Sequence, residues 1–273
     1  MLETTIGRRR RRASPYRKAL ITGASRGIGK AFAQKLPTST DLLLTARDLS
    51  ALNAIADDLR TDGRSVEVLA ADLATQGGIE AVLDWANAHE PDLFINNAGL
   101  ARYGAFLDHS FDDQRTTIDV NVTAALALLH GLVPGMSERA RDEGERAGVI
   151  NVASGLAFVP VPTMALYSAS KAFLLSFSEA LTAELANEPV DVLTLCPGAT
   201  KTEFGETAGY AGGALLGAME PGKVAQEAMS ALGLQSTLVL GVASKASLTP
   251  VALARSAFSK GVMGLSQLST RRR

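Results

Sequence analysis

The sequence predicts an α/β protein built as a single doubly wound, Rossmann-like domain, in which a seven-stranded parallel sheet carries helices on both faces. Three observations favour this fold class. The chain has 273 residues, a length that doubly wound domains often reach as one unit. Seven short runs are nearly continuous in Val, Ile, Leu and Ala, as strands buried on both faces should be. Helical stretches separate these runs, and strict alternation of strand and helix implies right-handed crossovers between parallel strands.

The expected elements follow one another without a linker or an internal repeat. We expect strands at residues 18–22, 42–46, 66–70, 93–96, 149–153, 190–196 and 237–240. We expect helices at residues 28–36, 49–60, 76–89, 111–136, 165–186 and 222–232. The stretch 205–217 is rich in Gly and Ala and lacks clear periodicity, so we expect a mobile flap there.

The composition is that of a globular protein from a reducing compartment. It is 47% hydrophobic and 20% charged, which argues against disorder and against a coiled coil. Cys196 is the single cysteine and cannot form an internal disulfide, so we expect a cytoplasmic protein. The uncharged stretch 147–170 is interrupted by Asn151, Pro160 and Pro162, so we expect no membrane span.

Basic charge is concentrated at the two ends of the chain. Residues 8–12 are all arginine, and so are residues 271–273. We expect three parts: a basic, solvated arm at 1–17, a dinucleotide-binding and catalytic domain at 18–246, and a tail at 247–273. Such an arm could instead bind nucleic acid or anionic lipid, but charge runs are usually solvated, so we expect no nucleic-acid partner. For the tail we expect a pocket cap, ahead of a subunit interface or a membrane contact.

A glycine-rich turn follows the first expected strand. Its sequence is Thr-Gly-Ala-Ser-Arg-Gly-Ile-Gly, at residues 22–29. Because glycine lacks a Cβ, the backbone can approach a pyrophosphate, and the helix N-terminus behind it offers free N–H donors. The place of this turn after the first strand of an alternating chain favours a dinucleotide site over an ordinary turn. We expect cofactor contacts from Gly23, Ser25, Arg26, Gly27, Ile28 and Gly29.

The end of the second expected strand indicates which dinucleotide binds. In NAD sites an acidic residue about 20 residues beyond the glycines accepts hydrogen bonds from the ribose 2′-hydroxyl, whereas an arginine accommodates a 2′-phosphate. Here Ala46 stands where the acid is expected, and Arg47 follows it. Arg26 lies in the glycine turn itself, and two guanidinium groups suit one phosphate. The sequence therefore favours NADP(H).

A third group of residues carries the chemistry. Tyr167 and Lys171 are four residues apart in an expected helix, so their side chains share one face. Ser154 lies at the end of the fifth expected strand, and the carboxyl ends of parallel strands form the ligand crevice. These three polar side chains therefore converge where a nicotinamide would lie. Asn121 is a fourth candidate, with a satisfied buried amide as the alternative interpretation.

These motifs together resemble those of the short-chain dehydrogenase/reductase family, in its ketoreductase-like branch. The family's glycine motif matches residues 22–29, its Asn-Asn-Ala-Gly motif residues 96–99, and its Tyr-x-x-x-Lys motif residues 167–171. The resemblance runs from about residue 18 to residue 240. It implies further cofactor contacts from Asp72, Leu73, Asn97, Gly99, Pro197, Gly198, Thr200 and Thr202, in addition to those of Tyr167 and Lys171.

The resemblance also implies a role for each catalytic residue. Tyr167 would be the general acid in carbonyl reduction, although an unperturbed phenol, with a pKa of about 10, is poorly matched to neutral pH. The ammonium of Lys171, with the positive nicotinamide of the oxidised complex, would lower that pKa, and it would bond the nicotinamide ribose. Ser154 would polarise the substrate carbonyl. Asn121 would hold a water that connects Lys171 to solvent. Family members also pair through helices, which implies a homodimer or homotetramer.

The sequence thus predicts an NADP(H)-dependent oxidoreductase that reduces a small-molecule ketone or aldehyde to an alcohol. An NAD-linked alcohol dehydrogenase is one alternative, and it would be expected to have an acidic residue where this chain has Ala46. A non-catalytic nucleotide-binding scaffold is another, and it would be expected to lack one of Ser154, Tyr167 or Lys171. The three histidines have no metal-ligand spacing, so we expect no metal.

Overall fold

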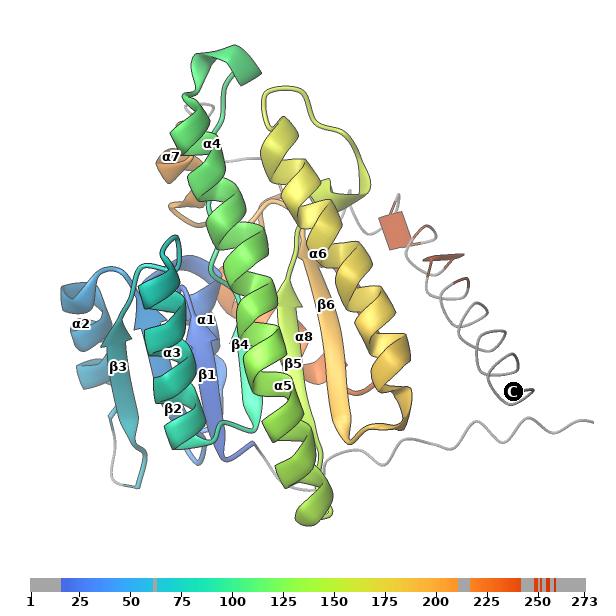
Figure 1. Cartoon of the computed structure of the whole chain (residues 1–273). Helices are drawn as coiled ribbons and strands as arrows, with labels where there is room; N and C mark the ends of the chain where they lie inside the picture. The colour runs from blue at the N-terminus through green and yellow to red at the C-terminus, as the bar shows by residue number, and fades with distance from the viewer. Residues whose placement is uncertain are drawn as a thin grey trace, which may run out of the picture.

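The computed structural model describes most of the chain as one α/β domain (Figure 1). It describes residues 16–60, 63–210 and 217–241, and in addition Leu248, Thr249, Val251, Ala254, Arg255 and Phe258. Residues 1–15 of the expected arm, residues 211–216 of the expected flap and most of the expected tail lie outside the described residues.

The seven expected strands are present and form one parallel sheet. They are β1 (Lys18–Thr22), β2 (Asp41–Ala46), β3 (Val66–Ala70), β4 (Leu93–Asn96), β5 (Ala147–Val152), β6 (Val190–Pro197) and β7 (Thr237–Leu240). Their order in the sheet is β3-β2-β1-β4-β5-β6-β7. The order reverses between β1 and β4, and ligands of such sheets bind at this switch point, beyond the carboxyl ends of the strands.

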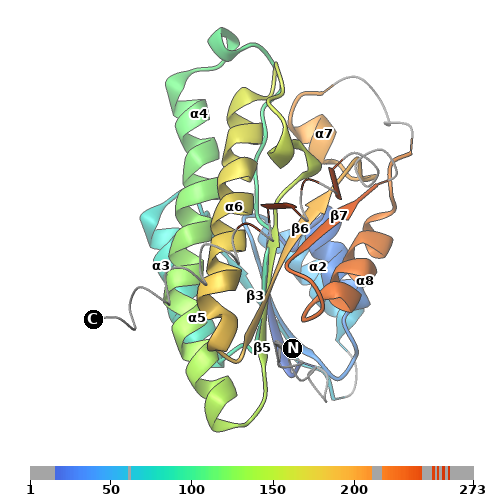
Figure 2. The same cartoon turned by 90° about the vertical axis from the view of Figure 1, so that its right-hand side faces the viewer.

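Helices cover both faces of the sheet, as expected. They are α1 (Gly27–Lys35), α2 (Leu49–Leu59), α3 (Gln76–His89), α4 (Phe111–Ile118), α5 (Ala125–Asp142), α6 (Ala165–Glu184), α7 (Phe204–Thr207) and α8 (Pro221–Ala231). Short 3-10 turns lie at Phe106–Asp108, Gly155–Phe158 and Leu185–Asn187. Figure 2 views the sheet nearly on edge, with α3, α5 and α6 on one side and α2 and α8 on the other. The doubly wound fold is therefore confirmed.

The alternation of side chains along each strand builds two apolar cores. In β1, Ala19 and Ile21 join the core beneath α1, α2 and α8, whereas Leu20 joins the core beneath α3 and α5. The same alternation in β2 sends Leu42 and Leu43 to opposite faces. A central strand that supplies both cores has no polar face, which explains the continuous apolar runs in the sequence. The edge strand β3 is the exception, since its Glu67 is exposed.

One long helix differs from the expectation. Residues 111–136 were expected to be helical, but the helix runs from Phe111 to Asp142 and changes to π-helical geometry at Asp119–Ala124. It extends past residue 136 because Ser137 and Ala140 are still buried against the body. Among the described residues it is the one helix long and apolar enough to cross a membrane, and half of its most apolar window is buried inside the protein. It packs on the sheet as a core helix.

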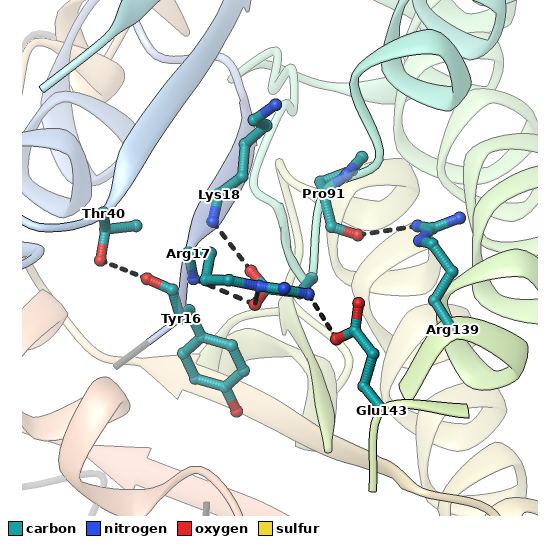
Figure 3. Close-up of polar contacts among 8 residues, drawn as sticks. Tyr16, Arg17, Lys18, Thr40, Pro91, Arg139 and Glu143 are labelled. Atoms are coloured by element: carbon teal, nitrogen blue, oxygen red, sulfur yellow. Dashed lines mark hydrogen bonds and ion pairs between the residues drawn. The ribbon is translucent and has the colours of Figure 1, made fainter. Parts of the chain in front are cut away.

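The chain contacts the folded body two residues before the expected domain boundary, and β1 itself begins at Lys18 (Figure 3). The main-chain N–H groups of Arg17 and Lys18 donate to the carboxylate of Asp92, over 3.0 and 2.9 Å. The carbonyl of Tyr16 accepts a hydrogen bond from the Thr40 hydroxyl, and its ring packs on the core. Tyr16 and Arg17 therefore belong to the body and not to the arm, because their polar and apolar groups already have partners there.

Candidate active site

The glycine turn and the Asn-Asn-Ala-Gly segment meet at the switch point of the sheet. The turn follows β1, and residues 96–99 end β4 and follow it. The Asn97 side chain donates to the carbonyls of Thr22 and Gly23, over 2.9 and 3.2 Å. The Thr22 hydroxyl accepts from the main-chain N–H groups of Asn97 and Ala98, both at 3.0 Å. Asn97, one of the expected cofactor contacts, therefore braces the glycine turn with its side chain.

The glycines of the turn are required by its geometry. Gly23 and Gly27 have φ angles of 65° and 55°, in the left-handed region that other residues rarely adopt. A Cβ on Gly29 would lie 2.3 Å from the carbonyl oxygen of Gly23, so no larger residue fits there. A Cβ on Gly27 would lie 3.3 Å from the methyl group of Thr202, which brings the loop after β6 against the turn. The backbone cradle that a pyrophosphate requires is present.

The three expected catalytic residues lie together at the carboxyl ends of β5 and β6. Tyr167 and Lys171 are in the first turns of α6, and the Lys171 ammonium lies 5.9 Å from the centroid of the Tyr167 ring. That ammonium donates to the carbonyl of Val152 at the end of β5, over 2.8 Å. Ser154 follows β5 and caps the next 3-10 turn by accepting from the Leu156 N–H. All three catalytic side chains are buried.

Burial dominates the protonation of this group. It raises the pKa of Tyr167 to about 12, and a hydrogen bond with Ser154 opposes that rise. Burial lowers the pKa of Lys171 to about 8. Burial is therefore the largest influence on the pKa of Tyr167 in the protein alone. The lowering of this pKa by Lys171 together with an oxidised nicotinamide concerns the complex and stays a prediction. Tyr167 is a phenol at neutral pH, and Lys171 is mostly an ammonium.

Asn121 lies in the π-helical segment, and both its amide oxygen and its amide nitrogen have hydrogen-bond partners. Its oxygen accepts from the Leu100 N–H at 2.7 Å, and its nitrogen donates to the Leu100 carbonyl and to the Ser170 hydroxyl. Ser170 in turn donates to the carbonyl of Tyr167 at 2.8 Å. The Asn121 side chain thus ties the segment after β4 to the catalytic helix. Short π-helical segments inside α-helices, like the one that holds Asn121, are frequent at functional sites.

Gly99 lies where two of these groups come together. A Cβ on Gly99 would be 3.2 Å from the ammonium nitrogen of Lys171 and 3.4 Å from the amide oxygen of Asn121. The structure therefore brings Gly99, Asn121 and Lys171 to one place, a grouping that the motif spacing did not predict for Gly99.

The residues expected to bind the adenosine end lie on the surface beyond β1, β2 and β3. Arg26 and Arg47 are exposed, and neither guanidinium has a carboxylate partner within the described ranges. Asp72 is exposed and accepts from the Ala74 N–H over 3.1 Å. The side chain of Leu73 is buried in the core beneath α3 and α5, so only its main chain is available to a ligand.

The loop after β6 is fixed at its base. Gly198 donates to the carbonyl of Leu240 at 2.9 Å, and Thr200 donates from its hydroxyl to the Gly198 carbonyl. Thr200 also pairs with Met219 in an isolated parallel bridge, which joins the two ends of the excursion that contains the expected flap. The described part of that flap holds the short helix α7, whose formation the lack of periodicity did not predict.

A hollow of about 350 Å³ lies beside the glycine turn, between α1, α7 and α8. Ser154, Tyr167 and Lys171 do not line it. Its lining mixes cationic and acidic side chains, namely Lys30, Lys201, Glu203 and Glu206, with Gly27 and Thr202 at its inner end. Among the residues described, no group of His, Cys, Asp or Glu could hold a metal ion.

Sequence reasoning missed three side chains of the site. Thr22 opens the glycine motif, but its bracing of the turn was not predicted. Ser170 bonds Asn121, and nothing distinguishes it from other buried hydroxyls before the fold is known. Phe204 packs on Tyr167, with ring centroids 5.6 Å apart, although 37 residues separate them in the chain. A contact between residues so distant in sequence has no local signal.

Comparison with known proteins agrees with this geometry. The family described as short chain dehydrogenase matches residues 17–210. The chain belongs to the short chain dehydrogenase family. It is therefore an oxidoreductase with the nucleotide-binding fold of that family, and the family expectation drawn from its motifs is confirmed.

Relatives with named activities are similar over about two thirds of the chain. A sulfoacetaldehyde reductase of Chromohalobacter salexigens is 37% identical over 193 residues, which are 67% of this chain and 72% of that reductase. The human 17-beta-hydroxysteroid dehydrogenase type 3 is 33% identical over 189 residues, which are 67% of this chain and 59% of that enzyme.

A solved structure is similar over most of the domain. It is a short-chain dehydrogenase from Sphingobium yanoikuyae in complex with NADPH, with a TM-score of 0.75 and 31% identity. The match covers 90% of this chain and 95% of that one. The similarity confirms the parallel, doubly wound sheet.

Proposed function

We propose that this protein is an NADP(H)-dependent reductase that converts a ketone or an aldehyde to an alcohol. One observation carries the proposal: Ser154, Tyr167 and Lys171 lie together at the carboxyl edge of the sheet, on the side where the glycine turn opens. The glycines keep side chains out of the turn, and α1 begins at Gly27 within it, so the residues present fit the pyrophosphate of a dinucleotide.

The bound cofactor would supply a hydride to the carbonyl carbon, and the side chains would manage the oxygen. As the hydride arrives, the carbonyl oxygen gains negative charge. The Tyr167 hydroxyl donates its proton to that oxygen, and the Ser154 hydroxyl donates a hydrogen bond to it. A pKa of about 12 keeps Tyr167 protonated at neutral pH, which is the state a proton donor needs.

Lys171 stabilises the tyrosinate left after this transfer. Its ammonium lies by the Tyr167 ring and is held by the Val152 carbonyl, so the charge does not have to move during the reaction. The proton that Tyr167 has donated is replaced from solvent. The route passes Asn121, Gly99 and Lys171, which lie together. In the oxidation direction the same tyrosinate would act as the base.

Charge at the end of β2 supports NADPH over NADH. Ala46 ends the strand without an acid to repel a phosphate, and Arg47 follows it as an exposed guanidinium with no carboxylate partner in the described ranges. Arg26 is exposed on the glycine turn. The similar structure from Sphingobium yanoikuyae contains NADPH, which agrees with this choice.

The protein would work as a homodimer or homotetramer in a reducing compartment such as the cytoplasm. Leu126 on α5 and Phe173 on α6 are large apolar side chains exposed on neighbouring outer helices (Figure 1), a surface that suits a second copy. Light scattering measures the oligomer directly, and a monomer at micromolar concentration would contradict this part of the proposal.

The test is the oxidation of NADPH with ketones and aldehydes of graded size, in wild type and in Tyr167→Phe. The variant keeps the ring and loses the proton donor, so its turnover should fall by about 10²–10⁴ while NADPH binding stays the same. Tyr16→Phe, at the opposite end of the sheet, is the matched control and should keep wild-type turnover. A non-catalytic scaffold would bind NADPH and show no turnover dependent on Tyr167.

A further inference from the structure

The side chains around Tyr167 form an apolar cluster. Tyr167 is buried together with Ala101 and Ala208, and Leu156, Met164 and Phe204 pack against them. The Phe204 ring is tilted by 50° to the Tyr167 ring. A carbonyl that reaches the Tyr167 hydroxyl comes beside these side chains. From this we infer that the site takes a carbonyl compound whose flanking groups are apolar, and that Phe204 sets this preference, an inference that rests on the proposed function.

Main-chain hydrogen bonds hold Phe204 in this position. The Tyr103 N–H donates to the carbonyl of Ala208, directly after α7, over 2.7 Å. The Gly104 N–H donates to the carbonyl of Thr163, just before α6, over 3.0 Å. The segment after β4 thus connects α7 with the start of the catalytic helix. Phe204 is presented to Tyr167 by a braced backbone and not by a free loop.

Among the described residues, the cations nearest in the chain to the cluster already have partners. Arg102 forms an ion pair with Asp113 over 2.7 Å, and Lys201 forms one with Glu220 over 2.6 Å. The ammonium of Lys171 is bonded to the Val152 carbonyl. Residues 207–210 and 217–219, which the structure describes, include no charged residue.

Two acidic residues lie close to Phe204 in the chain, Glu203 and Glu206, and both line the hollow between α1, α7 and α8 that Tyr167 does not line. They offer no positive charge to a substrate. Burying a carboxylate or a sulfonate without a partner is costly. Neutral apolar groups do not meet this penalty.

A pair of aldehydes with the same shape separates the two substrate classes. Sulfoacetaldehyde carries a sulfonate two bonds from the carbonyl carbon, and 3,3-dimethylbutanal carries a tert-butyl group of similar size there. The related reductase from Chromohalobacter salexigens, which is named for the first compound, serves as the reference enzyme. We expect this protein to favour 3,3-dimethylbutanal by about 100-fold or more in kcat/KM, because the cluster cannot pair the sulfonate.

The outcomes of this comparison are distinct. The inference is overturned if turnover depends on Tyr167 but is equal for both aldehydes or greater for sulfoacetaldehyde. The proposed reductase function is unaffected by that result. Turnover that Tyr167→Phe does not slow, with either aldehyde, overturns the proposed function itself.

Phe204→Ala tests the residue assigned to this preference. Removing the ring should lower kcat/KM for 3,3-dimethylbutanal by about 10-fold and leave sulfoacetaldehyde almost unchanged, so the ratio between the aldehydes falls. The affinity for NADPH, followed by fluorescence, should stay the same. Phe111→Ala removes a ring that is 78% exposed and lies outside the cluster, so it should preserve the wild-type ratio. An equal loss for both aldehydes in Phe204→Ala would show that the ring is only structural.

Discussion

The ammonium of Lys171 donates a 2.8 Å hydrogen bond to the main-chain carbonyl of Val152. The bond joins α6 to the last residue of β5, two residues before Ser154. Lys171 is thereby fixed beneath Tyr167 in a site from which water is excluded. Burial fixes the position of the Lys171 ammonium and also disfavours its charge. This effect can be measured in the pH dependence of the free energy of unfolding.

Lys171 should make stability rise with pH in the alkaline range. Burial lowers the pKa of Lys171 from 10.5 to about 8. Between these values the unfolded chain still binds the proton that the folded chain has released, so the free energy of unfolding increases with pH. From pH 7.5 to 9.5 wild type should gain about 2 kcal/mol over Lys171→Met, measured by urea unfolding. The contributions of Tyr167 and Cys196 are common to both proteins and cancel; parallel pH curves would contradict the burial of a charged Lys171.

Two adjacent glycines at the start of α3 should respond to alanine with opposite signs. A Cβ on Gly77 would meet nothing within 4 Å, so Gly77→Ala should raise the free energy of unfolding by about 0.5–1 kcal/mol through better helix propensity. A Cβ on Gly78 would lie 2.0 Å from the Asp72 carbonyl oxygen, so Gly78→Ala must displace the backbone. It should lower stability by more than about 1 kcal/mol and weaken cofactor binding beside Asp72. Urea unfolding distinguishes them, and equal shifts would argue against the close approach at Gly78.

Two truncations should locate the edge of the folded body. Deleting residues 2–15 should leave the free energy of unfolding within about 0.5 kcal/mol of wild type, since the expected arm has no apolar stretch to bury. Deleting residues 2–17 also removes Tyr16 and Arg17, which contact Thr40, Asp92 and the core (Figure 3). That deletion should lower stability by about 2–3 kcal/mol. A large loss in the shorter truncation would show that the arm packs on the body.

Cofactor preference should change with two substitutions at the end of β2. Arg47→Ala should weaken NADPH binding by about 10- to 150-fold, the value of a charge-assisted hydrogen bond, and should barely affect NADH. Adding Ala46→Asp supplies an acceptor for a 2′-hydroxyl and repels a 2′-phosphate, so the preference should move to NADH. The measurement is the ratio of kcat/KM for the two cofactors in wild type and both variants. A ratio that stays fixed, or a wild type that prefers NADH, would remove Arg47 from the 2′-phosphate site.

The elements whose signals are local could be predicted from the sequence. The strands at 18–22, 66–70, 93–96 and 237–240 have the predicted bounds, because apolar runs and the residues that end them are adjacent in the chain. The strand predicted at 149–153 lies instead at Ala147–Val152, since Gly148 pairs with Leu93 through the sheet. Strand ends of this kind depend on the neighbouring strand.

The contacts that join distant segments could not be predicted in the same way. The motif spacing placed Tyr167 and Lys171 on one helix face, and the structure confirms it. The packing of Phe204 on Tyr167 depends on how the loop after β6 returns over the sheet, and periodicity carries no information on that. The pKa of Tyr167 likewise depends on the water that burial excludes, which residue types alone do not show.

The transfer of deuterium from the cofactor to the product tests the proposed hydride transfer most directly. Wild-type protein would be given NADPH deuterated at the reactive position of the nicotinamide, together with 3,3-dimethylbutanal, and the alcohol would be analysed by mass spectrometry. The account predicts one deuterium on the carbinol carbon of the alcohol, formed about 10²–10⁴ times more slowly in Tyr167→Phe. An alcohol without deuterium, or an equal rate in the variant, would contradict hydride transfer to a carbonyl that Tyr167 protonates.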